Sequence, residues 1–168
     1  MPALEPAYAV TPRSLKPDDA AHIAAWPPYP AEFQDLDYAL RKGGWIDEYR
    51  GKPETHFLIA DEAGKPIAFT ILSKTGTGEA EFRIAVRADK IGSGVGKLLT
   101  RATLAKGFGE MALSRIHLIV RKNNLRAAHV YERLGFVQRG ELNKIVNGRP
   151  AEFIVMDLRR EEWSSDSV

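Results

Sequence analysis

The sequence has 168 residues, of which 44% are apolar and 27% charged, and its 24 basic and 22 acidic residues leave a formal net charge of +2. This length predicts a single domain over residues 1–168, with a core at about 7–159 and a polar tail at 160–168. The small net charge, without any block of Lys or Arg, argues against a nucleic-acid partner.

Cysteine is absent from the sequence, which excludes disulfides, thiolate metal sites and a covalent cysteine mechanism. No His, Asp and Glu residues have metal-ligand spacing, so we predict no metal site. No apolar run approaches the ~20 residues that a membrane helix needs. Residues 1–10 lack the basic and then apolar pattern of a signal peptide. We therefore expect a cytoplasmic protein without a membrane partner.

The first half of the chain alternates between extended and helical patterns. Pro17-Asp18-Asp19 has the form of a helix start, because acidic side chains favour the positive end of the helix dipole. Three prolines exclude regular structure directly after Trp26. In chain order we predict a strand at 7–13, a helix at 18–25, one or two helices at 31–50 with a break near Gly43-Gly44, and strands at 56–60, 66–73 and 79–86.

The second half begins with a glycine-rich turn at 91–96. The pattern then predicts a helix to about Gly107, a strand at 115–121, a helix at 124–134 that ends at Gly135, and a hairpin of strands 136–146 and 151–158. Strand–helix–strand units require some parallel pairing, while consecutive strands favour antiparallel pairing. We therefore expect an α/β fold (mixed α+β), with one twisted, mixed sheet of about seven strands and helices on both faces.

Glycines stand at positions 92, 94 and 96, where the strand is expected to pass into the helix. They allow close approach of the backbone to a ligand, and the first amides of the helix form an anion site for a phosphate or pyrophosphate. Lys90 and Lys97 would add positive charge. The segment lacks the hydroxyl of the P-loop after Gly96-Lys97 and the spacing of the dinucleotide fingerprint. The alternative is a loop that only turns the chain.

A second motif follows the strand at 115–121. Its matching positions are Asn124, Ala127, Tyr131, Gly135 and Phe136. Together the two segments resemble the GNAT superfamily of acyl-CoA-dependent N-acetyltransferases. The first is similar to its Val-x-x-x-x-Gln/Arg-x-x-Gly-x-Gly/Ala motif, with Ile91 in place of Gln/Arg, and the second matches its Asn-x-x-Ala-x-x-x-Tyr-x-x-x-Gly-Phe motif in full.

The resemblance covers about residues 7–159 and implies a GNAT-like sheet splayed between its fourth and fifth strands. It also implies acetyl-CoA as cosubstrate. The pyrophosphate would be held by the segment Ile91, Gly92, Ser93, Gly94, Val95, Gly96 and Lys97. The pantetheine arm would pair with the backbone of Ile84, Ala85 and Val86, and Asn124 and Ala127 would lie close to the cofactor. Because Ile91 stands at the Gln/Arg position of the motif, the segment has one polar side chain fewer than the motif.

Acetyl transfer to an amine needs a base for the ammonium, a donor for the carbonyl oxygen and a proton for the departing thiolate. The resemblance assigns the thiolate's proton to Tyr131, whose alternative role is that of a core aromatic. The backbone amide of Val86 or of a neighbour would donate a hydrogen bond to the carbonyl oxygen of the thioester. Glu81 is the first candidate for the base and Glu79 the second, with His117 and His129 as further options. A solvated strand carboxylate is the alternative for Glu81.

The predicted function is therefore an N-acetyltransferase that moves an acetyl group from acetyl-CoA to a primary amine by direct attack in a ternary complex. The alternative is a catalytically idle acyl-CoA-binding or regulatory domain of the same fold. Aromatic and acidic residues between Trp26 and Glu48 suit a cationic amine, but they also fit a core with a solvated helix face. The acceptor stays open between a small-molecule amine, a peptide N-terminus and a lysine, and a homodimer is one option for the assembly.

Overall fold

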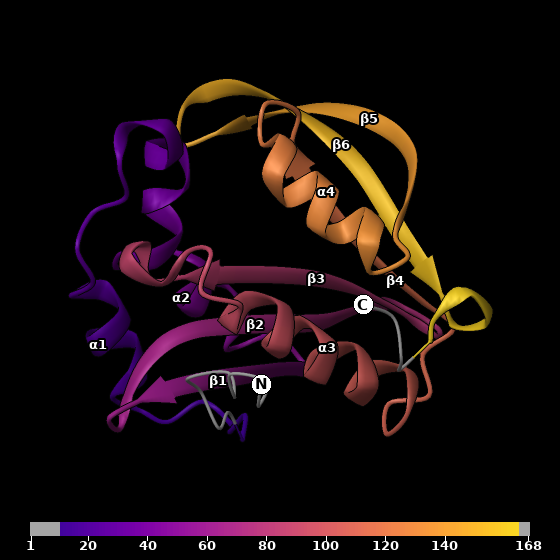
Figure 1. The fold of residues 1–168 in the computed structure, drawn as a ribbon, viewed down its shortest axis with the longest axis horizontal. Helices are drawn as coiled ribbons and strands as arrows, with labels where there is room; N and C mark the ends of the chain where they lie inside the picture. Colours follow the sequence, from indigo (N-terminus) through magenta and orange to yellow (C-terminus); the bar gives the residue numbers. More distant parts are fainter. Residues whose placement is uncertain (1–10, 165–168) are drawn as a thin grey trace, which may run out of the picture. The chain divides into compact units, whose positions relative to one another are not determined.

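Figure 1 shows a computed structural model of the chain, which describes residues 11–164. The α-helices are α1 (Asp19–Ala24), α2 (Trp45–Tyr49), α3 (Val95–Phe108) and α4 (Leu125–Arg133), and the 3₁₀ helices are η1 (Ala31–Leu40), η2 (Ala88–Lys90) and η3 (Arg160–Glu162). The strands are β1 (Thr55–Glu62), β2 (Lys65–Gly76), β3 (Glu79–Val86), β4 (Arg115–Arg121), β5 (Val137–Val146) and β6 (Arg149–Arg159).

These strands form one mixed sheet in the order β1-β2-β3-β4-β6-β5. The β3–β4 pair is parallel, whereas β1–β2, β4–β6 and β5–β6 are antiparallel. The parallel register joins Glu79 to Arg115, Ala80 to Ile116 and Glu81 to His117, although β3 continues to Val86 and β4 to Arg121. In the described chain this pairing stops at Glu81 and His117, which is the predicted splay. The α/β fold class is thus confirmed.

The strand count differs from the expected seven, since six strands are described. Residues 7–10 of the first expected strand lie outside the described part of the chain, and Arg13 makes only an isolated bridge with Ile59. The helical segment at 31–50 divides near Gly43-Gly44 as predicted, but its first part is a 3₁₀ helix.

Backbone contacts divide the chain into two compact units. The boundary between the units falls within the strands β2 and β3 and within the helix α3. The first unit comprises Met1–Ser73 and Arg83–Thr103, and the second comprises Lys74–Phe82 and Leu104–Val168. In the first unit one apolar cluster joins α1, η1 and α2 to Phe57, Ile59, Phe69, Ile71 and Ala85. A second cluster joins the start of α3, through Val95 and Leu99, to strand residues of β1 and β2. Helices therefore cover both faces of the strands in this unit.

In the second unit, alternate residues of β3 and β4 divide the sheet into an apolar and a polar face. Ala80, Phe82, Ile116 and Leu118 are buried, whereas their neighbours Glu79, Glu81, Arg115 and His117 are partly exposed and polar. The segment expected as a polar tail begins with η3, and the ring of Trp163 lies 5.4 Å from that of Phe108. Residues 165–168 lie outside the described part of the chain.

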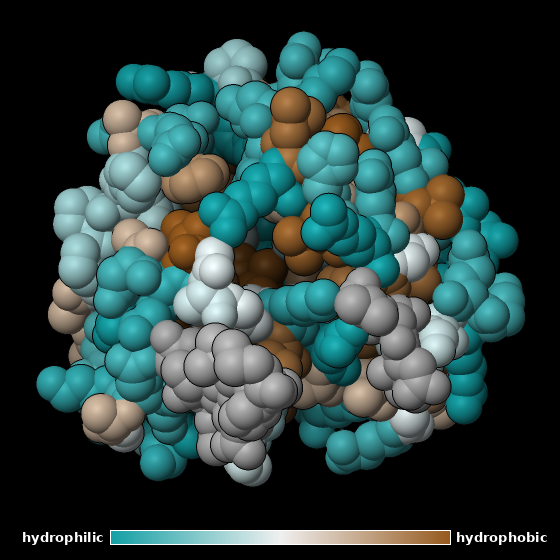
Figure 2. Space-filling model, viewed as in Figure 1, coloured by the Kyte–Doolittle hydropathy of each residue, from teal (hydrophilic) through white to brown (hydrophobic). Residues whose placement is uncertain are grey.

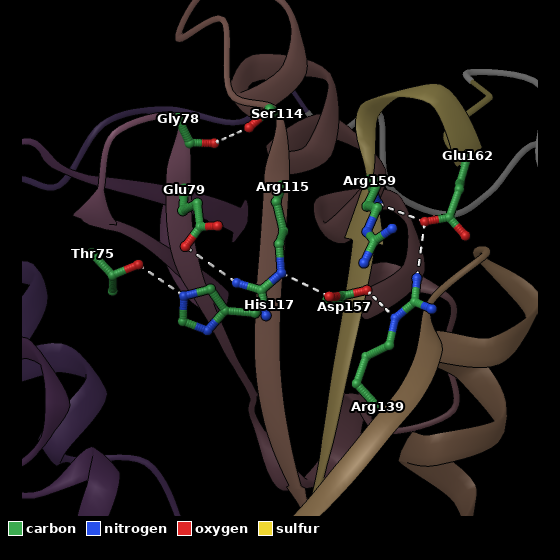
Figure 3. Close-up of polar contacts among 10 residues, drawn as sticks. All are labelled: Thr75, Gly78, Glu79, Ser114, Arg115, His117, Arg139, Asp157, Arg159 and Glu162. Atoms are coloured by element: carbon green, nitrogen blue, oxygen red, sulfur yellow. Dashed lines mark hydrogen bonds and ion pairs between the residues drawn. The ribbon is translucent and has the colours of Figure 1, made fainter.

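A buried carboxylate ties three strands of the polar face together (Figure 3). Asp157 on β6 is 2% exposed and accepts hydrogen bonds of 2.7 Å from Arg115 on β4 and from Arg139 on β5. Arg115 also pairs with Glu79 at 3.3 Å, and Arg139 with Glu162 at 3.1 Å. Burial alone would raise the pKa of Asp157, but the two guanidiniums outweigh it and hold the pKa below its usual value.

Hydrophilic side chains predominate on the face drawn in Figure 2, and apolar residues appear there as separate patches. Among residues 11–164, no helix combines the length and the apolar character that a bilayer crossing requires.

Replacing Asp157 by Asn should lower the free energy of unfolding at pH 7 by about 2–4 kcal/mol, because two guanidiniums lose their shared buried carboxylate. Urea unfolding measures the difference. Since the folded pKa lies below the unfolded value of about 3.9, the contribution is complete above that value and is lost as the pH falls through the folded pKa. The difference in the free energy of unfolding between the wild type and Asp157→Asn should therefore become smaller toward pH 3.

The matched control is Glu110→Gln, which removes an exposed carboxylate 3.2 Å from Lys106 and should change stability by less than about 0.5 kcal/mol. Equal effects of the two substitutions would contradict a special role for Asp157.

Candidate active site

The glycine-rich segment forms an open cradle at the start of α3. Gly92 and Gly94 have φ of 84° and 96°, which L side chains rarely adopt, and space is open around the Cα of Gly94. Gly96 serves a different purpose, because a Cβ there would lie 3.3 Å from Cγ2 of Val86 and 3.7 Å from Cδ1 of Ile84. The glycines therefore shape the turn and let the helix start lie close to β3.

Four amides of the cradle face no acceptor in the described part of the chain, namely those of Gly92, Gly94, Gly96 and Lys97. The neighbouring amides are used, since Ser93 N–H donates to the carbonyl of Lys90 and Val95 N–H to Ser93 Oγ. Open amides at the positive end of a helix dipole attract an anion. This arrangement fits the predicted pyrophosphate cradle.

The two lysines beside the cradle differ in their surroundings. Lys90 forms an ion pair of 2.8 Å with Glu62, so its charge is directed toward β1. Lys97 lies in the first turn of α3 and makes no ion pair with a described residue. Lys97 is therefore the better candidate for a charge that meets an anion. Ile91, which replaces the polar residue of the motif, donates only its backbone amide, to Ala88 at 3.4 Å.

The predicted pantetheine segment Ile84–Val86 ends beside a partly buried tyrosine. The hydroxyl of Tyr29 donates to the carbonyl of Val86 at 2.8 Å and occupies one of the two lone pairs of that oxygen. Ala85 is 7% exposed and belongs to the apolar cluster under α1, η1 and α2. The side chain of Ala85 thus serves packing, which leaves the main chain of this segment for the expected pairing with pantetheine.

Tyr131 of α4 is held by two phenylalanines of the second unit. Its ring meets Phe82 at 6.3 Å and 85° and Phe136 at 5.7 Å and 62°, both edge-to-face geometries. Its hydroxyl makes no hydrogen bond with any described residue, and burial alone raises its pKa. The ring is fixed by packing while its polar end is unused. This combination suits a proton donor better than a core tyrosine, whose hydroxyl normally finds a partner.

Glu81 and His117 occupy the last paired position of the parallel ladder. The Nε2 atom of His117 lies 2.8 Å from Oγ1 of Thr75, at the end of β2 (Figure 3). Phe82, which meets Tyr131, follows Glu81 directly on β3 and points to the opposite face of the strand. Tyr131 and the Glu81–His117 position therefore lie on opposite faces of β3.

Three other predicted residues have structural partners. The side chain of Asn124 caps α4 by accepting from the amide of Ala127 at 3.2 Å. Glu79, the second candidate for the base, is paired with Arg115. His129 is exposed on α4 and lies 3.5 Å from Glu132. Of the two base candidates among them, Glu79 is neutralised by its pairing with Arg115, and His129 lies on an exposed helix surface.

The aromatic residues of the N-terminal helices are largely engaged within the first unit. Trp26 Nε1–H donates to the carbonyl of Pro66, and its ring packs on Phe69. The rings of Trp45 and Tyr49 stack on the guanidinium of Arg83, at 4.9 and 5.5 Å. A core role accounts for these rings, so they give no support to the alternative of a cationic-amine pocket.

Sequence reasoning missed Thr75 and Tyr29 as neighbours of the site. Thr75 lies beyond the expected strand at 66–73, but β2 runs on to Gly76 and brings the Thr75 hydroxyl to His117. Tyr29 is one of the aromatic residues between Trp26 and Glu48, and no local pattern indicates its bond to Val86.

The chain is similar to known proteins of one enzyme family. The model of the acetyltransferase (GNAT) family matches residues 19–136. Spermidine N(1)-acetyltransferase of Escherichia coli (strain K12) is 30% identical over 89 residues, which are 52% of this chain and 48% of that protein. Spermidine N(1)-acetyltransferase of Vibrio cholerae is 36% identical over 72 residues, or 42% of each chain. The chain thus spans about half the length of the curated relatives it matches.

The fold also matches a solved structure, that of spermidine N-acetyltransferase from Vibrio cholerae in complex with CoA and spermine. Its TM-score is 0.68 at 23% identity, and the match covers 91% of this chain and 96% of that one.

The unused hydroxyl of Tyr131 leads to a prediction on stability. Tyr131→Phe should change the free energy of unfolding by less than about 0.5 kcal/mol, because no hydrogen bond is lost. The control, Tyr29→Phe, removes the bond to Val86 and should cost about 1 kcal/mol. Both are measured by urea unfolding at pH 7. A larger cost for Tyr131→Phe than for Tyr29→Phe would show that the Tyr131 hydroxyl has a structural partner.

Proposed function

Because the chain belongs to the acetyltransferase (GNAT) family, we propose that it transfers an acetyl group from acetyl-CoA to a primary amine by direct attack in a ternary complex. The observation that carries this proposal is Tyr131, which matches the tyrosine of the family motif and has a fixed ring with an unused hydroxyl.

The residues present fit acetyl-CoA. The open amides of Gly92, Gly94, Gly96 and Lys97 would hold its pyrophosphate, with the ammonium of Lys97 beside them. The main chain of Ile84–Val86 would pair with the amides of pantetheine, as an added strand pairs with a sheet edge. The amide of Val86 or a neighbour remains the proposed donor to the carbonyl oxygen.

The proposed chemistry proceeds by direct attack. An acceptor ammonium, with a pKa near 10, must first lose a proton, and Glu81 is the proposed base for this step. The neutral amine then attacks the thioester carbonyl, the C–N bond forms and the C–S bond breaks. Tyr131 gives its proton to the departing thiolate and regains one from the nitrogen of the new amide. The raised pKa of Tyr131 keeps the hydroxyl protonated until that moment.

For the acceptor we propose a small-molecule amine, with polyamines as the first compounds to test. The relatives that match part of this chain carry the name of spermidine acetyltransferases. Glu81 supplies a negative charge on the polar face of the sheet, which suits a cationic acceptor. A cytoplasmic location and a homodimer stay predictions.

A second candidate function is a catalytically idle acyl-CoA-binding domain of the same fold. It is favoured by one observation, namely that Ile91 stands where the motif has Gln or Arg. Such a domain would bind CoA and acetylate no amine.

Binding of CoA tests the cradle. Gly94→Val forces a β-branched residue toward φ 96°, which displaces the open amides and should weaken CoA binding at least about tenfold, the effect of losing one charge-assisted hydrogen bond. Isothermal titration calorimetry measures the affinity. Gly51→Val is the control, because space around Gly51 is open and its φ is not positive. Unchanged affinity in the Gly94 variant would remove the cradle assignment.

Acetyl transfer is tested with acetyl-CoA, a panel of amines and a thiol reagent that reports free CoA, since the chain has no cysteine to react. Wild-type protein should release CoA with at least one amine. Tyr131→Phe should lower kcat by about 10²–10⁴-fold and leave CoA affinity unchanged. If kcat and CoA affinity of Tyr131→Phe fall together, Tyr131 has a structural role. If the wild type binds CoA but acetylates no amine, the chain is the idle CoA-binding domain.

A further inference from the structure

His117 stands out among the histidines of the described chain because of its position and its single polar partner. It shares the last paired position of the β3–β4 ladder with Glu81, and its side chain lies on the polar face of the sheet. One ring nitrogen, Nε2, lies 2.8 Å from Thr75 Oγ1. The other, Nδ1, has no hydrogen-bond partner among the described residues, so one nitrogen can exchange a proton while the other holds the ring.

The chemistry of the proposed reaction calls for a base with a pKa closer to neutral than that of a carboxylate. A solvated glutamate, with an ordinary pKa of about 4.3, retains a proton poorly when it competes with an amine of pKa near 10. An imidazole, at about 6.5, comes much closer to the amine and to the working pH.

Burial and the positive charge of Arg115 keep the ring of His117 neutral, so that it can accept a proton. Burial lowers its pKa, and the adjacent Arg115 on β4 lowers it further. The carboxylates of Glu81 and Glu79 on β3, and of Asp157 on β6, act in the opposite direction without cancelling these effects. Arg115 is itself fixed by Asp157 and Glu79, so the positive charge beside the ring stays in place.

We infer that His117 is a further catalytic residue, whose imidazole, next to Glu81, takes up the proton that the acceptor ammonium loses. This inference rests on the proposed function and refines the part given there to Glu81. Glu81 keeps its negative charge, attracts the ammonium and stabilises the imidazolium that forms. The proton passes from the amine nitrogen to the imidazole and then to solvent. The neutral amine attacks the thioester, and the second proton of its nitrogen returns to Tyr131.

The experiment is the pH dependence of kcat/KM between pH 5 and 9, with acetyl-CoA and the most active amine of the panel. Wild-type activity should rise through one ionisation with a midpoint below 6.5 and then stay level, because ammonium is the bound form and the imidazole must be neutral. His117→Gln should lose about 10²–10⁴-fold in kcat/KM and should lack this ionisation. Glu81→Gln should keep the ionisation but move its midpoint to lower pH, since a charge that favours imidazolium is gone.

The matched control is His129→Gln, on the exposed side of α4, which should keep the wild-type profile. CoA affinity and thermal midpoint of His117→Gln should equal those of the wild type. The ring resonances of His117 in the intact protein provide a second measurement that needs no folded variant, and their titration midpoint should equal the kinetic one.

Three results would overturn the inference. His117→Gln could retain the activity and the ionisation. The wild-type rate could rise with unit slope up to the pKa of the amine, which would show that the neutral amine binds from solution. The ring resonances could titrate at a pH different from the kinetic midpoint. A wild-type protein that binds CoA but acetylates no amine would instead overturn the proposed function itself.

Discussion

The parallel pairing of β3 with β4 extends over three residue pairs and stops at Glu81 and His117. Main-chain groups beyond that point need other partners, because unpaired amides and carbonyls away from water are costly. The amides of a pantetheine arm are chemically suited to be those partners. The same stop puts two titratable side chains at the last position that the two strands share. The proposed cofactor pairing and the proposed base thus depend on one feature of the sheet.

The strand β4 is held in place by β6, which pairs with the edge of β4 opposite to β3. All seven residues of β4 pair with β6, from Arg115–Arg159 to Arg121–Phe153. Asp157 adds a buried carboxylate that joins β4 to β5 through two arginines. Because Arg115 belongs both to this network and to the surroundings of His117, it contributes, after burial, to the lowered pKa of the proposed base.

The proposed acid and base act from opposite faces of β3. Phe82 holds the ring of Tyr131 on the apolar face, and Glu81, one residue earlier, points to the polar face. A donor that stays protonated needs apolar surroundings, whereas a group that binds a cation and passes a proton to solvent needs polar ones. The alternation of a single strand supplies both environments within two residues.

The sequence by itself determined most of the elements and the family. The alternating pattern of 79–86 and 115–121 gave both strand ranges, and the spacing of Asn124, Tyr131 and Gly135 identified α4 and its ends, because periodicity and capping are local properties. Only the tertiary structure decided which polar residues are engaged. Three contacts depend on the register between strands or on contacts between distant segments. They are the pairs Glu79–Arg115, Tyr29–Val86 and Thr75–His117. Local patterns carry no record of such contacts, since they arise when the whole sheet assembles.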